Sequence, residues 1–195
     1  MKRAVFLDRD GVVNRAVLRQ GKPYAPTLLS DLRLLPGVRE ACNRLHEAGF
    51  ALILITNQPD IARGLVSAER VSEMNRRLQQ FLRLDGVGVC PHDDSARCSC
   101  RKPQPGLLLE AARVWNIDLQ SSFIVGDRWR DIAAGQRAGC RAIFIDYGYA
   151  EQRPDGPFIS VGSLREASQW ILRTTRRGVP EQTPRLKPAE TRRYA

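Results

Sequence analysis

The sequence predicts a three-layer α/β fold in which helices cover both faces of a central parallel sheet. Short, continuous apolar runs alternate along the chain with amphipathic stretches of helical periodicity. Strands that are apolar on both faces are typical of parallel sheets buried between helices. Polar residues cluster directly after several of these runs, and open α/β sheets bind their ligands at that edge. These observations favour a Rossmann-like fold with one site at the carboxyl edge of the sheet.

The expected strands are the apolar runs of the chain. Residues 4–7 are predicted to form a buried strand that ends at Asp8, and residues 51–55 a second strand that ends at Thr56. Further strands are expected at residues 122–125 and 141–145, with a short one at 158–159.

The expected helices lie between these strands. The segment 37–48 places its apolar residues on one face, and Gly49 ends the pattern. Ser67 is a candidate N-cap for a helix over residues 67–84. The remaining helices are expected at residues 106–115, 131–138 and 163–173.

Two segments interrupt the alternation of strands and helices. Residues 15–35 contain two prolines and a glycine, and we expect them to form a small flap, or minimal cap, over the edge of the first strand. Residues 85–105 hold three of the five cysteines, and we interpret them as an inserted loop.

Length and charge predict one domain followed by a tail. The chain has 195 residues, which suit one domain over residues 1–173 and a basic, disordered tail over residues 174–195. The net charge is +10, and the last 23 residues supply half of it, with seven basic residues against two acidic ones. A solvated terminus explains this charge better than a nucleic-acid or membrane contact. The chain lacks an apolar run of the ~18 residues that a membrane span needs, so we expect a cytoplasmic enzyme. We also expect a monomer.

The strongest chemical signal directly follows the first expected strand. Asp8 and Asp10 are two carboxylates two positions apart. Beside a metal ion the first can act as a nucleophile, while the second donates and then accepts a proton. Gly11 lets the backbone turn sharply beneath an incoming phosphate. A calcium-binding EF-hand is disfavoured, because its twelfth position, counted from Asp8, would hold Arg19 in place of glutamate.

Four short motifs together resemble the signature of the haloacid dehalogenase (HAD) superfamily, in the same order and at similar spacing. They are Asp8-x-Asp10-Gly11-Val12, Ile55-Thr56-Asn57, Lys102-Pro103 and Gly126-Asp127-x-x-x-Asp131. The resemblance covers residues 4–146 and implies a Mg²⁺-dependent phosphatase that forms an aspartyl-phosphate. It makes Asp8 the nucleophile and Asp10 the acid/base.

The resemblance also implies roles for the other motifs. Thr56 would bind phosphoryl oxygens with Asn57 nearby, and Lys102 would neutralise the phosphate and the nucleophile. The Mg²⁺ ligands that it implies are the carboxylates of Asp8 and Asp127 and the backbone carbonyl of Asp10, with Asp131 in support. This set suits phosphoryl transfer, which needs positive charge on the equatorial oxygens and an in-line nucleophile.

The cysteine-rich segment offers a second metal site, this one structural. Three thiols and one imidazole lie within eleven positions, at Cys90, His92, Cys98 and Cys100. Cys₃His is a common structural zinc set, and a reducing compartment favours metal over disulfides for such a cluster. We expect a bound Zn²⁺ to fix the loop over residues 90–100, so that the next residues point into the active site. The alternative is a metal-free loop with exposed thiols.

The zinc loop narrows the resemblance to two branches of the superfamily. Cys-Pro-His followed by Cys-x-Cys-Arg-Lys-Pro is similar to heptose 1,7-bisphosphate 7-phosphatases and to histidinol-phosphate phosphatases. The segment Ile61–Gly64 favours the heptose branch, whereas Pro59 and the flap differ from it. The substrate-binding residues that this branch implies are Asn57, Gln58, Arg63, Arg128 and, for the distal phosphate, Arg101.

Two rival hypotheses fit the sequence less well. A zinc-containing module that binds nucleic acid would explain the cysteines and the basic tail, but it leaves the polar residues at the strand ends unexplained. The sequence also lacks the aromatic residues interleaved with basic ones that a single-strand platform needs. A catalytically idle scaffold is disfavoured by the intact motifs. We therefore expect a phosphatase for a small phosphorylated metabolite, most simply a sugar bisphosphate.

Overall fold

Six parallel strands form the central sheet of the protein, whose computed structural model describes residues 1–176. The strand order is β5-β4-β1-β6-β7-β8, so that β1 lies in the middle between β4 and β6. The strands are β1 (Ala4–Leu7), β4 (Ala51–Asn57), β5 (Gly86–Cys90), β6 (Phe123–Gly126), β7 (Arg141–Ile145) and β8 (Ile159–Val161). This arrangement confirms the predicted Rossmann-like α/β fold.

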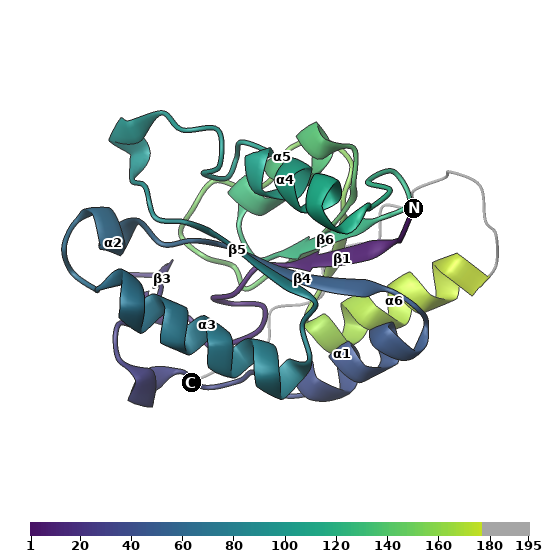
Figure 1. Ribbon diagram of the computed structural model, residues 1–195, viewed down its shortest axis with the longest axis horizontal. Helices are drawn as coiled ribbons and strands as arrows, with labels where there is room; N and C mark the ends of the chain where they lie inside the picture. The colour runs from purple at the N-terminus through teal and green to yellow at the C-terminus, as the bar shows by residue number, and fades with distance from the viewer. Residues whose placement is uncertain (177–195) are drawn as a thin grey trace.

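Helices cover both faces of the sheet, as Figure 1 shows. One face carries α1 (Val38–Glu47), α3 (Ala68–Leu82) and α6 (Leu164–Arg176), and the other carries α4 (Gly106–Trp115) and α5 (Trp129–Ala138). A short helix, α2 (Pro59–Ala62), follows β4 at the carboxyl edge. None of the helices within residues 1–176 is long and apolar enough to cross a membrane.

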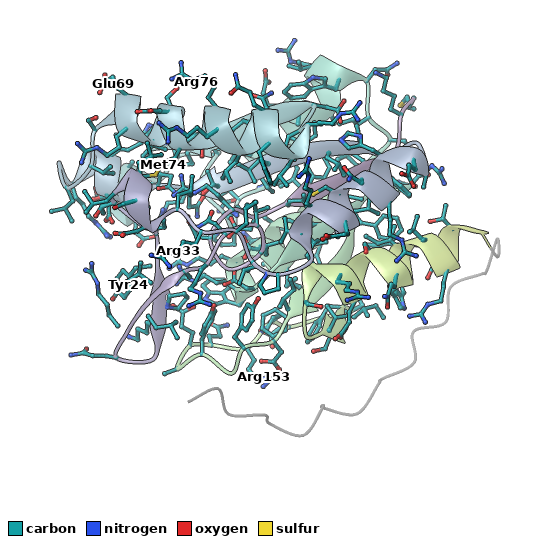
Figure 2. All side chains as sticks on the ribbon, turned by 90° about the horizontal axis from the view of Figure 1, so that it is seen from below. Tyr24, Arg33, Glu69, Met74, Arg76 and Arg153 are labelled. Carbon is teal, nitrogen blue, oxygen red and sulfur yellow. The ribbon has the colours of Figure 1, made fainter. Side chains whose placement is uncertain are left out.

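The strands supply two separate cores because successive side chains point to opposite faces of the sheet. Val5 and Leu7 of β1 pack with α1 and α6, whereas Phe6 packs with α4 and α5. The covering helices are amphipathic in the same sense. In Figure 2, the buried Met74 of α3 lies on the inner side of the helix, while Glu69 and Arg76 point outward.

The flap expected over residues 15–35 forms a two-stranded hairpin with a short 3₁₀ helix. The hairpin joins β2 (Val17–Arg19) to β3 (Lys22–Tyr24), and the 3₁₀ helix η1 spans Leu29–Asp31. The tip is fixed to the loop after β7, because the Gly21 carbonyl accepts a 2.9 Å hydrogen bond from the Ala150 backbone amide. Figure 2 shows this hairpin, which bears Tyr24, beside the loop that bears Arg153.

One expected loop is a strand. Residues 86–90, interpreted from the sequence as part of an insertion, form the edge strand β5 and pair with β4 from Ile53↔Gly86 to Asn57↔Cys90. The two glycines of this strand weaken its sequence signal. Gly86 has a packing reason, because a Cβ there would come within 2.5 Å of the Trp115 ring.

Helix α3 ends at Leu82, two residues before the expected end, and two other helices extend beyond their expected bounds. Helix α5 begins at Trp129, two residues before the expected start at Asp131, because the Arg128 backbone amide donates to the Asp131 carboxylate and caps the first turn. Helix α6 continues to Arg176, so the tail does not begin at 174. The rest of the predicted tail, 177–195, lies outside the described residues.

Candidate active site

The carboxyl ends of three neighbouring strands bring the predicted catalytic residues together. Asp8 follows β1, Thr56 lies near the end of β4, and Asp127 follows β6. Asp8 and Thr56 line a cleft of about 200 Å³, and Asp127 lies beside Asp8 just behind its wall. The residues that line this cleft are Asp8, Asp10, Lys22, Pro23, Tyr24, Ala25, Thr56, Asn57, Pro59, Asp60, Arg63, Asp94, Arg101, Lys102, Arg128, Arg130, Asp131 and Glu151.

A buried lysine bridges two carboxylates at the inner end of the cleft. Lys102 Nζ lies 2.5 Å from Asp8 Oδ1 and 2.6 Å from Asp131 Oδ1, and it also donates to the Ile55 carbonyl at 3.0 Å. Burial alone would lower the pKa of Lys102, but the carboxylates of Asp131 and Asp8 outweigh it and raise that pKa above its ordinary value. Lys102 is therefore a fixed positive charge beside Asp8.

The inner end of the cleft carries more negative than positive charge. Burial, assisted by the neighbouring carboxylates of Asp131 and Asp10, raises the pKa of Asp8 to about 7 despite the opposing effect of Lys102. Burial, with the charge of Asp8 next in importance, also raises the pKa of Asp127 well above its ordinary value. Three buried carboxylates with one ammonium group are unfavourable unless another cation joins them.

The side chain of Asp127 indicates where such a cation would bind. Both of its carboxylate oxygens are buried and accept no hydrogen bond of ordinary geometry. The nearby Tyr149 hydroxyl lowers the pKa of Asp127 somewhat but makes no well-formed bond to either oxygen. One carboxylate oxygen each of Asp8, Asp127 and Asp131 can be chosen so that all lie within 4.8 Å of one another. Buried, unpaired carboxylate oxygens are ligands that suit Mg²⁺.

The backbone of Gly11 lies directly against Asp127, beside the candidate Mg²⁺ ligands. Its φ is +98°, and a Cβ at this position would lie 1.8 Å from Asp127 Oδ2. A side chain is therefore excluded by contact as well as by conformation, so that the first loop can approach Asp127 closely.

The carboxylate of Asp10 is held by three donor side chains. Arg9, which is fully buried, donates from Nε to both Asp10 oxygens at 3.1 Å. Asn14 Nδ2 donates to Oδ1 at 2.8 Å and Gln58 Nε2 donates to Oδ2 at 2.9 Å. This network fixes the position from which Asp10 can exchange a proton in the cleft.

The ends of β4 and the zinc loop are tied together by one asparagine. The Asn57 side chain donates to the Lys102 carbonyl at 3.0 Å and accepts from the Lys102 backbone amide at 3.1 Å. The neighbouring Thr56 hydroxyl accepts a 2.8 Å hydrogen bond from Gln58 Nε2. Thr56 and Lys102, predicted to contact the same phosphate, are thus held in one rigid unit.

The predicted zinc ligands converge on one point. Cys90 Sγ lies 3.2 Å from Cys100 Sγ and 3.7 Å from Cys98 Sγ, and His92 Nδ1 lies 3.4 Å from Cys100 Sγ. One ligand atom from each of the four residues lies within 4.8 Å of the others. Three thiols and one imidazole at these separations fit the Cys₃His donor set of a structural zinc site.

Comparison with known proteins identifies the family of this chain. A family model described as HAD-hydrolase-like matches residues 99–166. A D-glycero-beta-D-manno-heptose-1,7-bisphosphate 7-phosphatase from Yersinia pestis is 39% identical over 181 residues, covering 87% of this chain and 89% of that protein. The chain belongs to the heptose-bisphosphate phosphatase family of the HAD superfamily.

Further relatives of this family agree in sequence and in structure. A D-glycero-D-manno-heptose-1,7-bisphosphate 7-phosphatase from Thermosynechococcus vestitus is 36% identical over 191 residues, covering 86% of this chain and 94% of that protein. The crystal structure of the D,D-heptose 1,7-bisphosphate phosphatase from B. bronchiseptica, complexed with magnesium and phosphate, matches with a TM-score of 0.77. It is 28% identical and covers 88% of this chain and 98% of that one. The protein is therefore a phosphatase, and phosphatases of the HAD superfamily use Mg²⁺.

In this heptose-bisphosphate phosphatase fold, the predicted substrate-binding residues differ in their contacts and in whether they line the cleft. Arg63 and Arg128 line the cleft and pair with Asp60 and Glu151 respectively. Arg101 also lines it, and its Nε donates to Asp94 Oδ1 at 3.0 Å. Gln58 is buried behind the wall and does not line the cleft; its amide binds Asp10 and Thr56 as described above.

Several residues of this site carry no recognisable sequence signal. Arg9 and Asn14 lie within and just after the first motif, but only the fold shows that both turn toward Asp10. Lys22 lies in the flap and Arg130 in the first turn of α5, and both reach the cleft. Asp94 lies between two predicted zinc ligands and accepts hydrogen bonds from Arg101 and Arg130. Charged residues are common in loops, so Lys22, Asp94 and Arg130 could not be singled out before the structure was known.

Proposed function

We propose that this protein hydrolyses the 7-phosphate of D-glycero-D-manno-heptose 1,7-bisphosphate through an aspartyl-phosphate on Asp8. The observation that carries the mechanism is the buried Asp8 at the end of the central strand, 2.5 Å from the Lys102 ammonium and facing the cleft. The substrate rests on the family and on the cations that line the cleft beyond Lys102. A single phosphate does not need that many positive groups.

The first half-reaction transfers the phosphoryl group to the enzyme. An Asp8 carboxylate oxygen attacks phosphorus, and the bond from phosphorus to the sugar oxygen breaks. Asp10 gives a proton to that leaving oxygen, while Lys102 and the Thr56 hydroxyl contact the phosphoryl oxygens. Mg²⁺, when held by Asp8, Asp127 and the Asp10 carbonyl with Asp131 in support, supplies positive charge to those oxygens.

The second half-reaction returns Asp8 to its starting state. Asp10, now ionised, accepts a proton from a water molecule that attacks phosphorus, and the bond from phosphorus to the Asp8 oxygen breaks to release inorganic phosphate. The hydrogen bonds from Arg9, Asn14 and Gln58 suit this step, because they hold Asp10 in position to accept the proton.

The predicted substrate-binding residues and the zinc loop complete the proposed site. We assign Asn57, Arg63, Arg101 and Arg128 to substrate binding, with Arg101 at the distal phosphate, and leave Gln58 to position Asp10. Zn²⁺ bound by Cys90, His92, Cys98 and Cys100 would be structural, because all four ligands come from the protein. The five free cysteines of the protein suit a reducing compartment, and we place the enzyme in the cytoplasm. We further propose that it is a monomer.

Histidinol phosphate is the alternative substrate, but the charges of the cleft disfavour it. That substrate carries a cationic amine and an imidazole away from its phosphate. The outer part of the cleft holds Arg101, Arg128 and Arg130, which would repel an ammonium group. A second phosphate, by contrast, would be attracted there.

A turnover panel tests the proposal. Purified enzyme with Mg²⁺ is assayed on heptose 1,7-bisphosphate, heptose 7-phosphate, histidinol phosphate, fructose 1,6-bisphosphate and an aryl phosphate. We expect kcat/KM to be highest for heptose bisphosphate, and a higher value for histidinol phosphate would favour the alternative. Asp8→Asn should remove turnover, since loss of an essential nucleophile costs about 10⁴-fold or more. Asp155→Asn makes the same chemical change at an exposed site and serves as the control.

A further inference from the structure

The charges of the cleft are divided into an inner group and an outer rim. The inner group holds the carboxylates of Asp8, Asp127 and Asp131 against the single ammonium of Lys102. With every group ionised, this leaves two negative charges, which one Mg²⁺ would balance. With Mg²⁺ bound, the net charge of the inner group would be zero, so this group would not attract a second anionic group on the substrate.

The rim has the opposite imbalance. Asp94 Oδ1 is shared by two guanidinium groups, from Arg101 Nε at 3.0 Å and from Arg130 Nη1 at 3.0 Å. One carboxylate thus serves two arginines, and one positive charge is left over.

Lys22 adds a second uncompensated charge to the rim. It lines the cleft from β3, and within residues 1–176 no carboxylate forms an ion pair with it. The other lining arginines are matched one to one, Arg63 with Asp60 and Arg128 with Glu151. The rim therefore carries two net positive charges, the charge that a phosphate dianion would neutralise.

The rim residues are held in place by contacts from separate elements. The hydrogen bond from Ala150 to Gly21 anchors the hairpin that carries Lys22. The Arg130 guanidinium lies 5.0 Å from the centre of the Trp129 ring. Lys22 and Arg130 also line a shallow depression that continues outward from the cleft. Lys22 from β3 and Arg130 from α5 thus line the same mouth.

Arg101 by itself has few donors left with which to bind a dianion. Its Nε is committed to Asp94, and its Nη1 donates to the His92 carbonyl at 3.1 Å. Arg130 makes one hydrogen bond among the described residues, through Nη1, so that its Nε and Nη2 have donors to offer. Lys22 has three N–H donors on a flexible stem.

We propose that Lys22 and Arg130 are specificity-determining residues, which together with Arg101 bind the second phosphate of a bisphosphate substrate. This inference rests on the proposed phosphatase function and adds two residues from outside its motifs. Asp94 is a positioning residue: it holds both guanidinium groups at the rim and leaves them a net positive charge.

The test compares a bisphosphate with a monophosphate in matched variants. We would measure kcat/KM for heptose 1,7-bisphosphate and for p-nitrophenyl phosphate in Lys22→Ala, Arg130→Ala and the double variant. The ratio of the two values should fall roughly 10- to 100-fold in each single variant, mainly through KM, because each loses a charge-assisted contact. Arg130→Lys should recover part of the loss, because it restores the charge.

Two control variants remove a positive charge outside the cleft. Arg19→Ala changes the residue opposite Lys22 in the hairpin. Arg113→Ala changes an exposed arginine that pairs with Glu110 on α4. Neither residue lines the cleft, so the ratio should stay within about twofold of the wild-type value in both.

The outcomes separate this inference from the proposed function. A wild-type enzyme that prefers fructose 1,6-bisphosphate contradicts the heptose substrate, yet the same ratio, measured with that bisphosphate, still tests the rim. A ratio that changes no more in Lys22→Ala and Arg130→Ala than in the controls would overturn the inference, even with heptose bisphosphate as the best substrate. Equal losses on both substrates would overturn it too, because they would show that the residues support the cleft's structure. A wild-type enzyme with no preference for any bisphosphate contradicts both.

Discussion

Replacing Gly11 by alanine tests whether the candidate Mg²⁺ site of Asp8, Asp127 and Asp131 depends on the close approach of the Gly11 backbone to Asp127. A Cβ at residue 11 would lie 1.8 Å from Asp127 Oδ2 and 2.4 Å from its Cγ. Real Cβ atoms essentially never come closer than 3.0 Å, so the two groups must separate by about 1.2 Å. The Asp127 carboxylate would then leave the position that it shares with Asp8 and Asp131.

The backbone conformation adds a second cost, which a control variant can isolate. Gly11 has a φ of +98°, where an L side chain costs about 1–2 kcal/mol. Gly49 has a similar φ of +80°, but a Cβ there would meet nothing within 4 Å. Gly49→Ala therefore reports the conformational cost alone, about 2–8 °C in Tm for a chain of this size.

The expected result is a difference between the two variants. Gly11→Ala should bind Mg²⁺ at least tenfold more weakly, measured as the Mg²⁺ concentration for half-maximal activity. It should also lose roughly 100-fold in kcat/KM on an aryl phosphate, as expected for a displacement of about 1 Å at a reacting centre. Gly49→Ala should keep both values. If Gly11→Ala loses no more Mg²⁺ affinity than Gly49→Ala, the backbone contact with Asp127 does not shape the site.

Two further predictions concern the metals and the pH dependence. Brief EDTA treatment should stop activity reversibly while about one Zn²⁺ per chain stays bound. Cys98→Ser should lower both Tm and activity. Elemental analysis that finds no zinc in freshly purified, reduced protein would refute the structural site. The kcat/KM ratio of bisphosphate to aryl phosphate should rise between pH 5 and 7, because the distal phosphate gains its second negative charge near pH 6 while Asp94, with a pKa of about 2, stays ionised. A pH profile measured on both substrates checks this, and a ratio that is flat or falls would count against recognition of a dianion at the rim.

The sequence was most informative where chemistry and periodicity coincide. Asp8, Thr56 and Asp127 each follow or end a continuous apolar run, and parallel strands must bring such positions to one edge. The convergence of the three cysteines and the histidine was equally predictable, because four ligand-type residues within eleven positions have few other uses. These features depend on short stretches of chain, so they survive without knowledge of the tertiary structure.

The features that the sequence did not predict depend on contacts between distant segments. Strand β5 contains two glycines, one of which is required by a tryptophan on α4, and its pairing with β4 overrides the weak local preference. The shared carboxylate of Asp94 joins the zinc loop to α5 across 36 positions in sequence. Lys22 reaches the cleft only because its hairpin docks on the loop after β7. No local pattern encodes such contacts.

The double hydrogen bond between Asn57 and the Lys102 backbone has a consequence for how this enzyme can diverge. The zinc loop is anchored at its start by the pairing of Cys90 with β4 and at its end by this bond. Its middle, between His92 and Cys98, carries Asp94, which accepts hydrogen bonds from Arg101 and Arg130 at the rim. Changes of length or sequence there can retune which molecules are accepted while Lys102 stays beside Asp8. Selectivity and reactivity can thus evolve on separate segments of one short stretch of chain.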